Sequence, residues 1–197
     1  MSNPAHAAGR RADARRNAEA IVRAAVEVLG YRPDASVAEI AQAAGVGRVT
    51  LYGHFPSRAD LVEAALAHAL ALGHTVLDPV DLEGDAAGAL TRLVDASWRL
   101  VATSRGLLMA AEKELTPGRI RDMHIDHAAR AERLITRGQA EGSFRSDLPA
   151  SWLVAVLQQV IHGAADEITA GRLEEADAAR YITATVLGAF APPSGGN

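Results

Sequence analysis

The sequence contains no cysteine, which excludes disulfide scaffolds, thiol nucleophiles and cysteine-based zinc sites. Aromatic residues make up only 4% of the 197 residues, and proline is scarce outside the chain ends, so β-rich folds are disfavoured. No window reaches the roughly 20 apolar residues of a membrane-spanning helix, and no N-terminal apolar run resembles a signal peptide. We therefore expect a cytoplasmic protein without membrane association.

Excess positive charge is confined to the first 58 residues. They carry eight arginines and five acidic residues, a formal charge of +3, whereas residues 59–197 carry −7. DNA, a large polyanion, is therefore attracted to the N-terminal part and repelled by the remainder. Four of these arginines, at positions 10, 11, 15 and 16, form a basic cluster, which is either an arm that contacts phosphates or a solvated tail.

The densest local signals lie between Ser36 and Arg58. The segment Ser36-Val37-Ala38-Glu39 is a capping box, which predicts a short helix that ends at Gly45. Glycine permits the left-handed backbone of a sharp reversal, and a second short helix around Leu51 follows it. Ser57-Arg58-Ala59-Asp60 then starts another helix. Two short helices around a tight turn are typical of a helix-turn-helix.

The second short helix carries the side chains that we expect to meet DNA. Its inward residues are predicted to be Val46, Leu51 and Phe55. On its outer side, an arginine can fork onto guanine, β-branched methyl groups can meet a thymine methyl group, and Tyr or His can donate to phosphate. The free N–H groups at the next helix start, with Arg58, can also receive a phosphate. The predicted DNA-binding residues are Ser36, Gly47, Arg48, Val49, Thr50, Tyr52, His54 and Arg58.

The stretch from about Ile21 to Leu66 resembles the DNA-binding domain of the TetR family of bacterial transcription regulators. The likeness is carried by Ser36–Ala41, Ala44–Val46 and Thr50–Arg58, the last containing a TLYxHF pattern. It departs from the family at Gly53, where many relatives carry a larger side chain. The resemblance implies dimerisation through the last two long helices and a small-molecule pocket in the C-terminal region.

Helical periodicity continues to the end of the chain, so we expect an all-α fold of about nine helices. Pro79 and Gly84 mark the best internal boundary. The predicted parts are a disordered basic tail over 1–12, a DNA-binding domain with a connector helix over 13–72, a ligand-binding and dimerisation domain over 85–190, and a disordered tail over 191–197. Within the third part, helices are expected around 90–101, 107–111, 117–141, 149–170 and 181–190.

The helix over 149–170 is too continuously apolar to bury only one stripe. Residues 153–157, Val160 and Ile161 leave little polar surface between them, so the helix must be covered on more than one side. The same helix and the last helix of a second subunit supply such a cover, with Gly163 and Gly188 allowing close approach. The alternative is a helix buried entirely within one subunit.

Candidate effector contacts are bulky or polar side chains of the C-terminal region, although residues of each kind more often belong to ordinary core or surface. The predicted pocket residues are Trp98, Met109, Glu112, Met123, His127 and Trp152. His124 and His127 share one helix face and can begin a metal site, but a closed site needs further ligands, and a solvated or packed pair is the alternative. We predict no metal and no cofactor. Hydrolase and metalloprotease motifs are also missing, so we predict that the protein is not an enzyme.

These features predict a homodimeric, ligand-responsive transcription regulator of the repressor type. Two recognition helices about 34–36 Å apart would enter successive major grooves of a palindromic operator. The alternative function is a helical protein-interaction module without specific DNA binding, and a small-molecule enzyme on a helical scaffold is a third.

Overall fold

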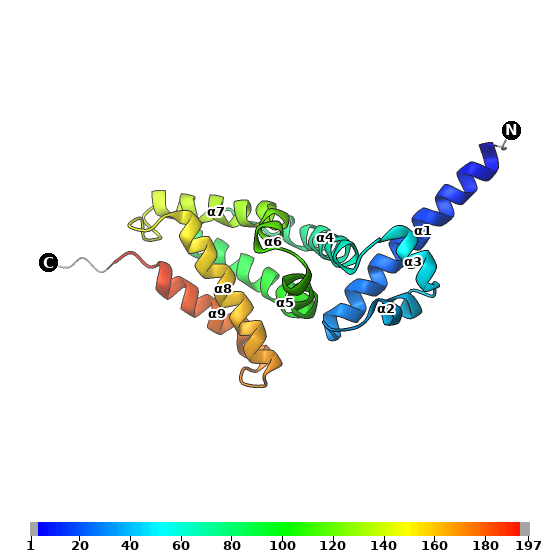
Figure 1. Cartoon of the computed structure of the whole chain (residues 1–197). Helices are drawn as coiled ribbons and strands as arrows, with labels where there is room; N and C mark the ends of the chain where they lie inside the picture. Colours follow the sequence, from blue (N-terminus) through cyan, green and yellow to red (C-terminus); the bar gives the residue numbers. More distant parts are fainter. Residues whose placement is uncertain (1–3, 194–197) are drawn as a thin grey trace. The chain divides into compact units, whose positions relative to one another are not determined.

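The computed structural model describes the backbone of residues 4–193 and the side chains of residues 13–193 (Figure 1). Over this range the fold is all-α, which confirms the predicted class. Its helices are α1 (Pro4–Tyr31), α2 (Val37–Ala43), α3 (Arg48–His54), α4 (Arg58–Leu77), α5 (Ala86–Glu114), α6 (Pro117–Met123), α7 (Ile125–Ala140), α8 (Ala150–Thr169) and α9 (Glu175–Phe190).

The described residues form two compact units. The N-terminal unit comprises the residues up to Ala71 together with Gly106–Ile120. The C-terminal unit comprises Leu72–Arg105 and the residues from Arg121 onward. Helices α4 and α5 therefore each contribute to both units. The sequence places 106–120 in the C-terminal domain, whereas the contacts of the folded chain group this segment with the N-terminal helices.

Close contacts explain that grouping. A Cβ atom on Gly106 would lie 2.1 Å from the carbonyl oxygen of Gly30, so the end of α1 and this part of α5 touch through their backbones. Lys113 on α5 also pairs with Asp34 at 2.6 Å. Glycine is required at position 106 because any larger residue would push the two helices apart.

The N-terminal unit has a small apolar core contributed by α1 to α4 and the end of α5. Its fully buried side chains include Ile21, Leu29, Ile40, Leu51, Leu61 and Val62. The predicted helix start at Ser57 is confirmed, because the Ser57 backbone N–H donates to the Asp60 carboxylate at 3.0 Å and the Asp60 N–H donates to the Ser57 hydroxyl at 3.1 Å. These caps fix where α4 begins.

The C-terminal unit is built around a larger core. Helix α8 packs against both α7 and α9, and it lies beside α9 in Figure 1. Phe144 and Phe190 meet edge to face, with ring centroids 5.9 Å apart. A Cβ on Gly138 would lie 2.2 Å from the Phe144 ring, so glycine makes room for that ring on α7. The Arg145 N–H donates to the Phe190 carbonyl at 2.8 Å and holds the end of α9.

Several helix boundaries differ from those that the sequence predicts. Helix α5 is continuous from Ala86 to Glu114, where two helices were expected, because nothing between Val101 and Leu107 stops a helix already formed. One helix was expected over 117–141, but α6 ends at Met123 and α7 starts at Ile125. Neither glycine nor proline marks the break at His124, so local sequence signals could not reveal it.

The chain ends also differ in part from the expected tails. Helix α1 begins at Pro4, so most of the segment 1–12 expected to be disordered has a helical backbone, and residues 1–3 lie outside the described residues. The Ala-rich sequence explains the extension, because adding residues to an existing helix costs little. After α9, residues 191–193 have no regular structure, and 194–197 lie outside the described range.

Among the described residues, α4 alone has the length and apolar composition of a helix that could cross a membrane. Its first half contributes Leu61, Val62 and Leu66 to the core of the N-terminal unit, and its charged Arg58 and Glu63 make ion pairs. These contacts are those of a helix packed within a folded domain.

Candidate DNA interface

The turn before α3 is built by two backbone devices. Gly45 has a φ of +69°, and the Val46 N–H behind it donates to the Ala41 carbonyl at 3.0 Å, which closes the end of α2. Gly47 is extended, with φ −73° and ψ 150°, and its carbonyl accepts the Leu51 N–H at 3.0 Å. The chain therefore reverses and starts α3 within three residues, as predicted.

Helix α2 is fixed by the predicted capping box. The Ser36 N–H donates to the Glu39 carboxylate at 2.7 Å, and the Glu39 N–H donates to the Ser36 hydroxyl at 3.3 Å. The hydrogen bonds from Ser36, followed by that from Arg32, hold the pKa of Glu39 below its usual value. Ser36 is exposed, but its hydroxyl is already engaged in the cap.

Helix α3 presents one face to its unit and another to solvent. Leu51 is fully buried and anchors the helix. Arg48, Val49, Thr50 and Tyr52 are all exposed, as predicted. Val49 is 88% exposed, so almost the whole of an apolar β-branched side chain faces water. The outer face of α3 therefore combines basic, apolar and hydroxyl-bearing side chains.

Two predicted contacts lie at the end of α3. His54 is half-buried, and its ring lies 6.4 Å from that of Phe55 at a tilt of 47°. Gly53 is exposed, and a Cβ there would meet nothing within 4 Å. The surface of α3 therefore has an open position between Tyr52 and His54.

Arg58 differs from the other predicted DNA-binding residues because its guanidinium group points into the N-terminal unit. It donates to the Glu114 carboxylate at 2.8 Å and to the carbonyl of Pro33 at 3.0 Å, and it also donates to the Ala35 carbonyl. The Arg58 side chain is 25% exposed. Sequence reasoning missed this arrangement because the carboxylate partner lies 56 residues away.

The basic cluster on α1 is partly neutralised. Arg15 pairs with Glu19 at 2.9 Å, and Arg16 pairs with Asp13. All four side chains are exposed, so each pair is weak and can exchange for another anion. The side chains of Arg10 and Arg11 lie outside the described residues.

The predicted effector residues are scattered. Met109 and Glu112 are exposed and belong to the N-terminal unit. In the C-terminal unit, Trp98 is buried in the core, whereas Trp152 is 57% exposed on α8. Met123 is half-buried at the end of α6. The predicted effector residues therefore belong to two different units and differ in exposure.

His127 packs within the C-terminal unit. Its ring stacks on that of His74 with centroids 4.1 Å apart, and it lies against Gly73. Over the described residues there is no group of three or more His, Asp or Glu side chains placed to hold a metal ion. The structure thus favours the packed alternative for this histidine.

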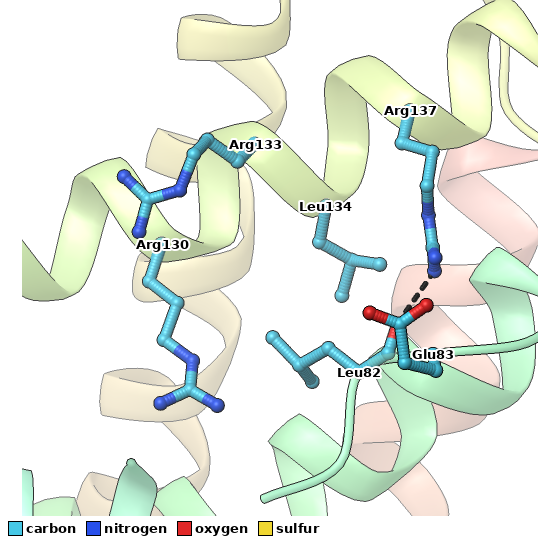
Figure 2. Close-up of a pocket in the computed structure, with 6 residues that line it drawn as sticks. All are labelled: Leu82, Glu83, Arg130, Arg133, Leu134 and Arg137. Atoms are coloured by element: carbon cyan, nitrogen blue, oxygen red, sulfur yellow. Dashed lines mark hydrogen bonds between the residues drawn. The ribbon is translucent and has the colours of Figure 1, made fainter.

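Sequence reasoning also missed a surface pocket of about 260 Å³ beside α7 (Figure 2). Arg130, Arg133 and Arg137 line it, together with Leu82, Glu83 and Leu134. Arg137 donates to the Leu82 carbonyl at 2.7 Å, and Arg130 donates to the Val80 carbonyl at 2.7 Å. Spacings of three and four residues place the three arginines on one helix face. This spacing is the sequence signal that could have indicated the pocket.

Helices α8 and α9 combine a buried side with an incompletely covered one. Leu153, Leu157 and Ile161 are buried within the unit. Val156 and Val160 are half-buried, and Gly163 and Gly188 are exposed with nothing within 4 Å of an added Cβ. Trp152 on α8 is 57% exposed and Tyr181 on α9 is 46% exposed, with the Arg180 guanidinium 4.5 Å from the centre of the Tyr181 ring.

Known proteins resemble this chain in sequence. Residues 21–65 match the family described as bacterial regulatory proteins, tetR family. The chain is 37% identical over 101 residues to the HTH-type transcriptional repressor LfrR of Mycolicibacterium smegmatis, covering 51% of this chain but only 52% of LfrR. It is 26% identical over 183 residues to the HTH-type transcriptional regulator NfxB of Pseudomonas aeruginosa, covering 89% of this chain and 95% of NfxB.

A solved structure of a TetR-like regulator has a fold similar to that of this chain. The crystal structure of the TetR-like regulator LfrR from Mycobacterium smegmatis in complex with proflavine superposes with a TM-score of 0.69 at 25% identity. The match covers 87% of this chain and 94% of the LfrR chain. The likeness therefore extends through both units and is not restricted to the helix-turn-helix.

Proposed function

Because this chain belongs to the TetR family of bacterial regulatory proteins, we propose that it is a cytoplasmic transcriptional repressor that a small molecule releases from a palindromic operator. The observation that carries the proposal is the outer face of α3, where Arg48, Val49, Thr50 and Tyr52 are exposed beside a buried Leu51. Basic, methyl-bearing and hydroxyl-bearing side chains on one short helix are suited to contact base edges in the major groove.

Each exposed side chain has a distinct task in this proposal. The Arg48 guanidinium donates to a guanine edge, and the methyl groups of Val49 and Thr50 contact thymine methyl groups. Tyr52 donates to a phosphate, with His54 beside it, while Ser36 and Gly47 lie at the two helix starts that border the groove. Arg58 acts on the protein side, since its donors are engaged within the unit.

The operator-binding form is a homodimer through α8 and α9. The exposed side chains of Trp152 on α8 and Tyr181 on α9 support this assembly, because a second subunit would remove this apolar surface from water. Gly163→Arg places a long charged side chain on that surface without a clash inside the subunit. We expect light scattering at micromolar concentration to show a dimer for the parent protein and for the control Ala140→Arg, and a monomer for Gly163→Arg.

The effector binds in the C-terminal unit. Proflavine, the molecule bound to LfrR in its crystal structure, is the first compound to test. Trp98 and Trp152, the two tryptophans of the chain, both belong to the C-terminal unit, so their fluorescence reports on this unit alone. Saturable quenching in Trp152→Phe, which retains only the buried Trp98, would place the compound within the unit. The effector and DNA should weaken each other's binding by the same factor.

DNA binding is tested with a duplex that the parent protein selects from a random-sequence pool. The logarithm of the binding constant should fall linearly with the logarithm of salt concentration, with a slope of about −0.9 per phosphate contact. Tyr52→Phe should weaken binding to all duplexes alike because it removes a phosphate donor. Failure of the parent protein to enrich any duplex would contradict the proposal and favour a protein-interaction module.

A further inference from the structure

The segment Gly106–Ile120 is far from the helix-turn-helix in sequence but makes several contacts within the N-terminal unit. We propose that Arg58 and Glu114 form a positioning contact for the helix-turn-helix, through which the end of α5 controls the affinity for DNA. We call Arg58, Glu114 and the carbonyl groups of Pro33 and Ala35 the Arg58 cluster. This inference rests on the proposed function and assigns to it a regulatory contact.

The Arg58 cluster joins three separate parts of the unit. Arg58 is the first residue of α4, and Glu114 is the last residue of α5. The carbonyls of Pro33 and Ala35 belong to the connection between α1 and α2, and both accept from the guanidinium group. A single side chain therefore fixes the approach to α2 against the ends of two longer helices.

Burial makes this contact stronger than an ordinary surface pair. The side chains of Arg58 and Glu114 are 25% and 28% exposed, and their N–O distance is 2.8 Å. By contrast, the Arg15–Glu19 pair on α1 is 81% and 51% exposed. Partly buried charge pairs are less screened by water and salt, and the loss of one partner leaves the other without compensation.

Neighbouring contacts keep the end of α5 in register with the cluster. The carboxylate of Glu63 accepts from Arg119 at 3.1 Å, and Lys113 pairs with Asp34 at 2.6 Å. At the other end of the segment, Gly106 lies directly against the backbone of Gly30. Since the segment is held at both ends, a shift of α5 along its axis would change the Arg58–Glu114 distance.

The competing role for Arg58 is direct contact with a DNA phosphate. Its Nε, Nη1 and Nη2 atoms all donate to protein acceptors in the structure. A phosphate contact would require breaking at least one of these bonds and separating the guanidinium from a carboxylate. The geometry thus favours positioning over phosphate binding, and the two roles differ in their response to salt.

Glu114→Gln gives the most decisive test, because loss of charge repulsion and loss of a positioning contact would change the affinity for DNA in opposite directions. Neutralising an acidic residue that lies near DNA would strengthen binding by removing repulsion. Loss of a positioning contact would weaken it, and we expect a fall of about 3- to 30-fold for the selected duplex. Asp95→Asn is the matched control, since it removes the same charge from an exposed position on the same helix and should leave affinity within about 2-fold.

Arg58→Gln separates positioning from phosphate contact. We expect weaker binding with an unchanged salt slope, whereas loss of a phosphate contact would make the slope shallower by about 0.9. The double variant Arg58→Gln with Glu114→Gln should bind no more weakly than Arg58→Gln alone, because both changes remove one interaction. If Arg58→Gln does not fold by circular dichroism, Glu114→Gln still decides the question.

The outcomes distinguish this inference from the proposed function. A parent protein that enriches no duplex would contradict DNA binding itself. A parent protein that binds its duplex, together with a Glu114→Gln variant that binds equally or more tightly, would overturn the role of the Arg58 cluster alone. A slope change of about 0.9 in Arg58→Gln would overturn it equally, by assigning Arg58 to a phosphate.

Discussion

The two units differ in the balance of charged and apolar contacts within each of them. In the N-terminal unit, charged side chains join segments far apart in sequence, as in the Arg58–Glu114 and Arg119–Glu63 pairs. The C-terminal unit depends on a larger apolar core, in which 18 buried side chains from α5 to α9 form one cluster. Charged pairs join distant segments in this unit too, as in Arg105–Asp166 and Arg130–Asp78, but the apolar core is its larger feature.

This difference has a functional counterpart. The N-terminal unit presents its candidate site as exposed side chains on a short helix, where each residue type can be matched to a chemical task. A ligand pocket in the C-terminal unit would instead be made of apolar side chains that resemble ordinary core. Mutations should therefore separate stability from DNA recognition more cleanly in the N-terminal unit.

The largest effect is expected from Phe190→Ala in the C-terminal core. Phe190 is fully buried and meets Phe144 edge to face, so we expect a loss of about 3–5 kcal/mol in the free energy of unfolding. Denaturation followed by tryptophan fluorescence measures it, because both tryptophans belong to this unit. Thr185→Ala, at an exposed position on α9, is the control. A loss below about 1 kcal/mol would contradict a unit stabilised by its apolar core.

A smaller loss, about 1–3 kcal/mol, is expected from Gly106→Ala in the N-terminal unit. The new methyl group would meet the Gly30 carbonyl, a backbone atom that cannot rotate away. Denaturation followed by circular dichroism should show this loss of stability. The unfolding midpoint followed by tryptophan fluorescence should shift less, because both tryptophans belong to the C-terminal unit. Equal shifts in both signals would show that the two units unfold together and would remove the energetic distinction between them.

The N-terminal helices were predictable because their ends are marked by local chemistry. The Ser36–Glu39 and Ser57–Asp60 capping boxes and the positive φ of Gly45 depend on residues within four positions of one another. The direction of Arg58 was not predictable, since its partner Glu114 is brought close only by folding. Exposed Arg48 and inward Arg58 have the same side chain, and tertiary contacts alone distinguish them.

Prediction was weaker in the C-terminal unit for the same reason. The all-α class and the extent of α8 follow from hydrophobic periodicity and from Pro149 at the helix start. The break at His124 has no local sequence signal. Trp98 and Trp152 were both predicted to line the effector pocket, yet Trp98 is buried and Trp152 is exposed. Bulky apolar residues alone do not indicate whether they line a pocket, fill a core or cover a surface.

Gly53→Ala should produce a gain of up to about 1 kcal/mol in the stability of the N-terminal unit. Alanine is a better helix former than glycine, and the added methyl group meets nothing within 4 Å. Thermal unfolding by circular dichroism measures the gain, with Gly106→Ala as the opposite case. Destabilisation by Gly53→Ala would indicate that this position contacts a neighbour that the structure does not show.

The smallest expected effect is a pH dependence carried by His162 in the C-terminal unit. Burial, followed by the nearby charges of Arg105 and His124, lowers the pKa of His162, against an opposing effect of Asp166. The unfolded chain therefore takes up the proton first, so stability is present above about pH 6.5 and is lost as the pH falls below it.

His162→Gln should consequently show a smaller fall in melting temperature than the parent protein between pH 7.5 and 5.5. Carboxylates with lowered pKa, such as Glu39 and Glu167, lose their contribution only at more acidic pH. A parallel fall in the variant and the parent protein would assign the acid sensitivity to other groups.

The central claim, that α3 reads DNA sequence, is tested most directly by the base preferences of Arg48→Ala. Parent and variant proteins are each used to select duplexes from the same random pool at one salt concentration. We predict that the parent enriches an inverted repeat and that Arg48→Ala loses its preference at one base pair in each half-site, while the other positions remain. An unchanged preference at every position would contradict a recognition role for α3.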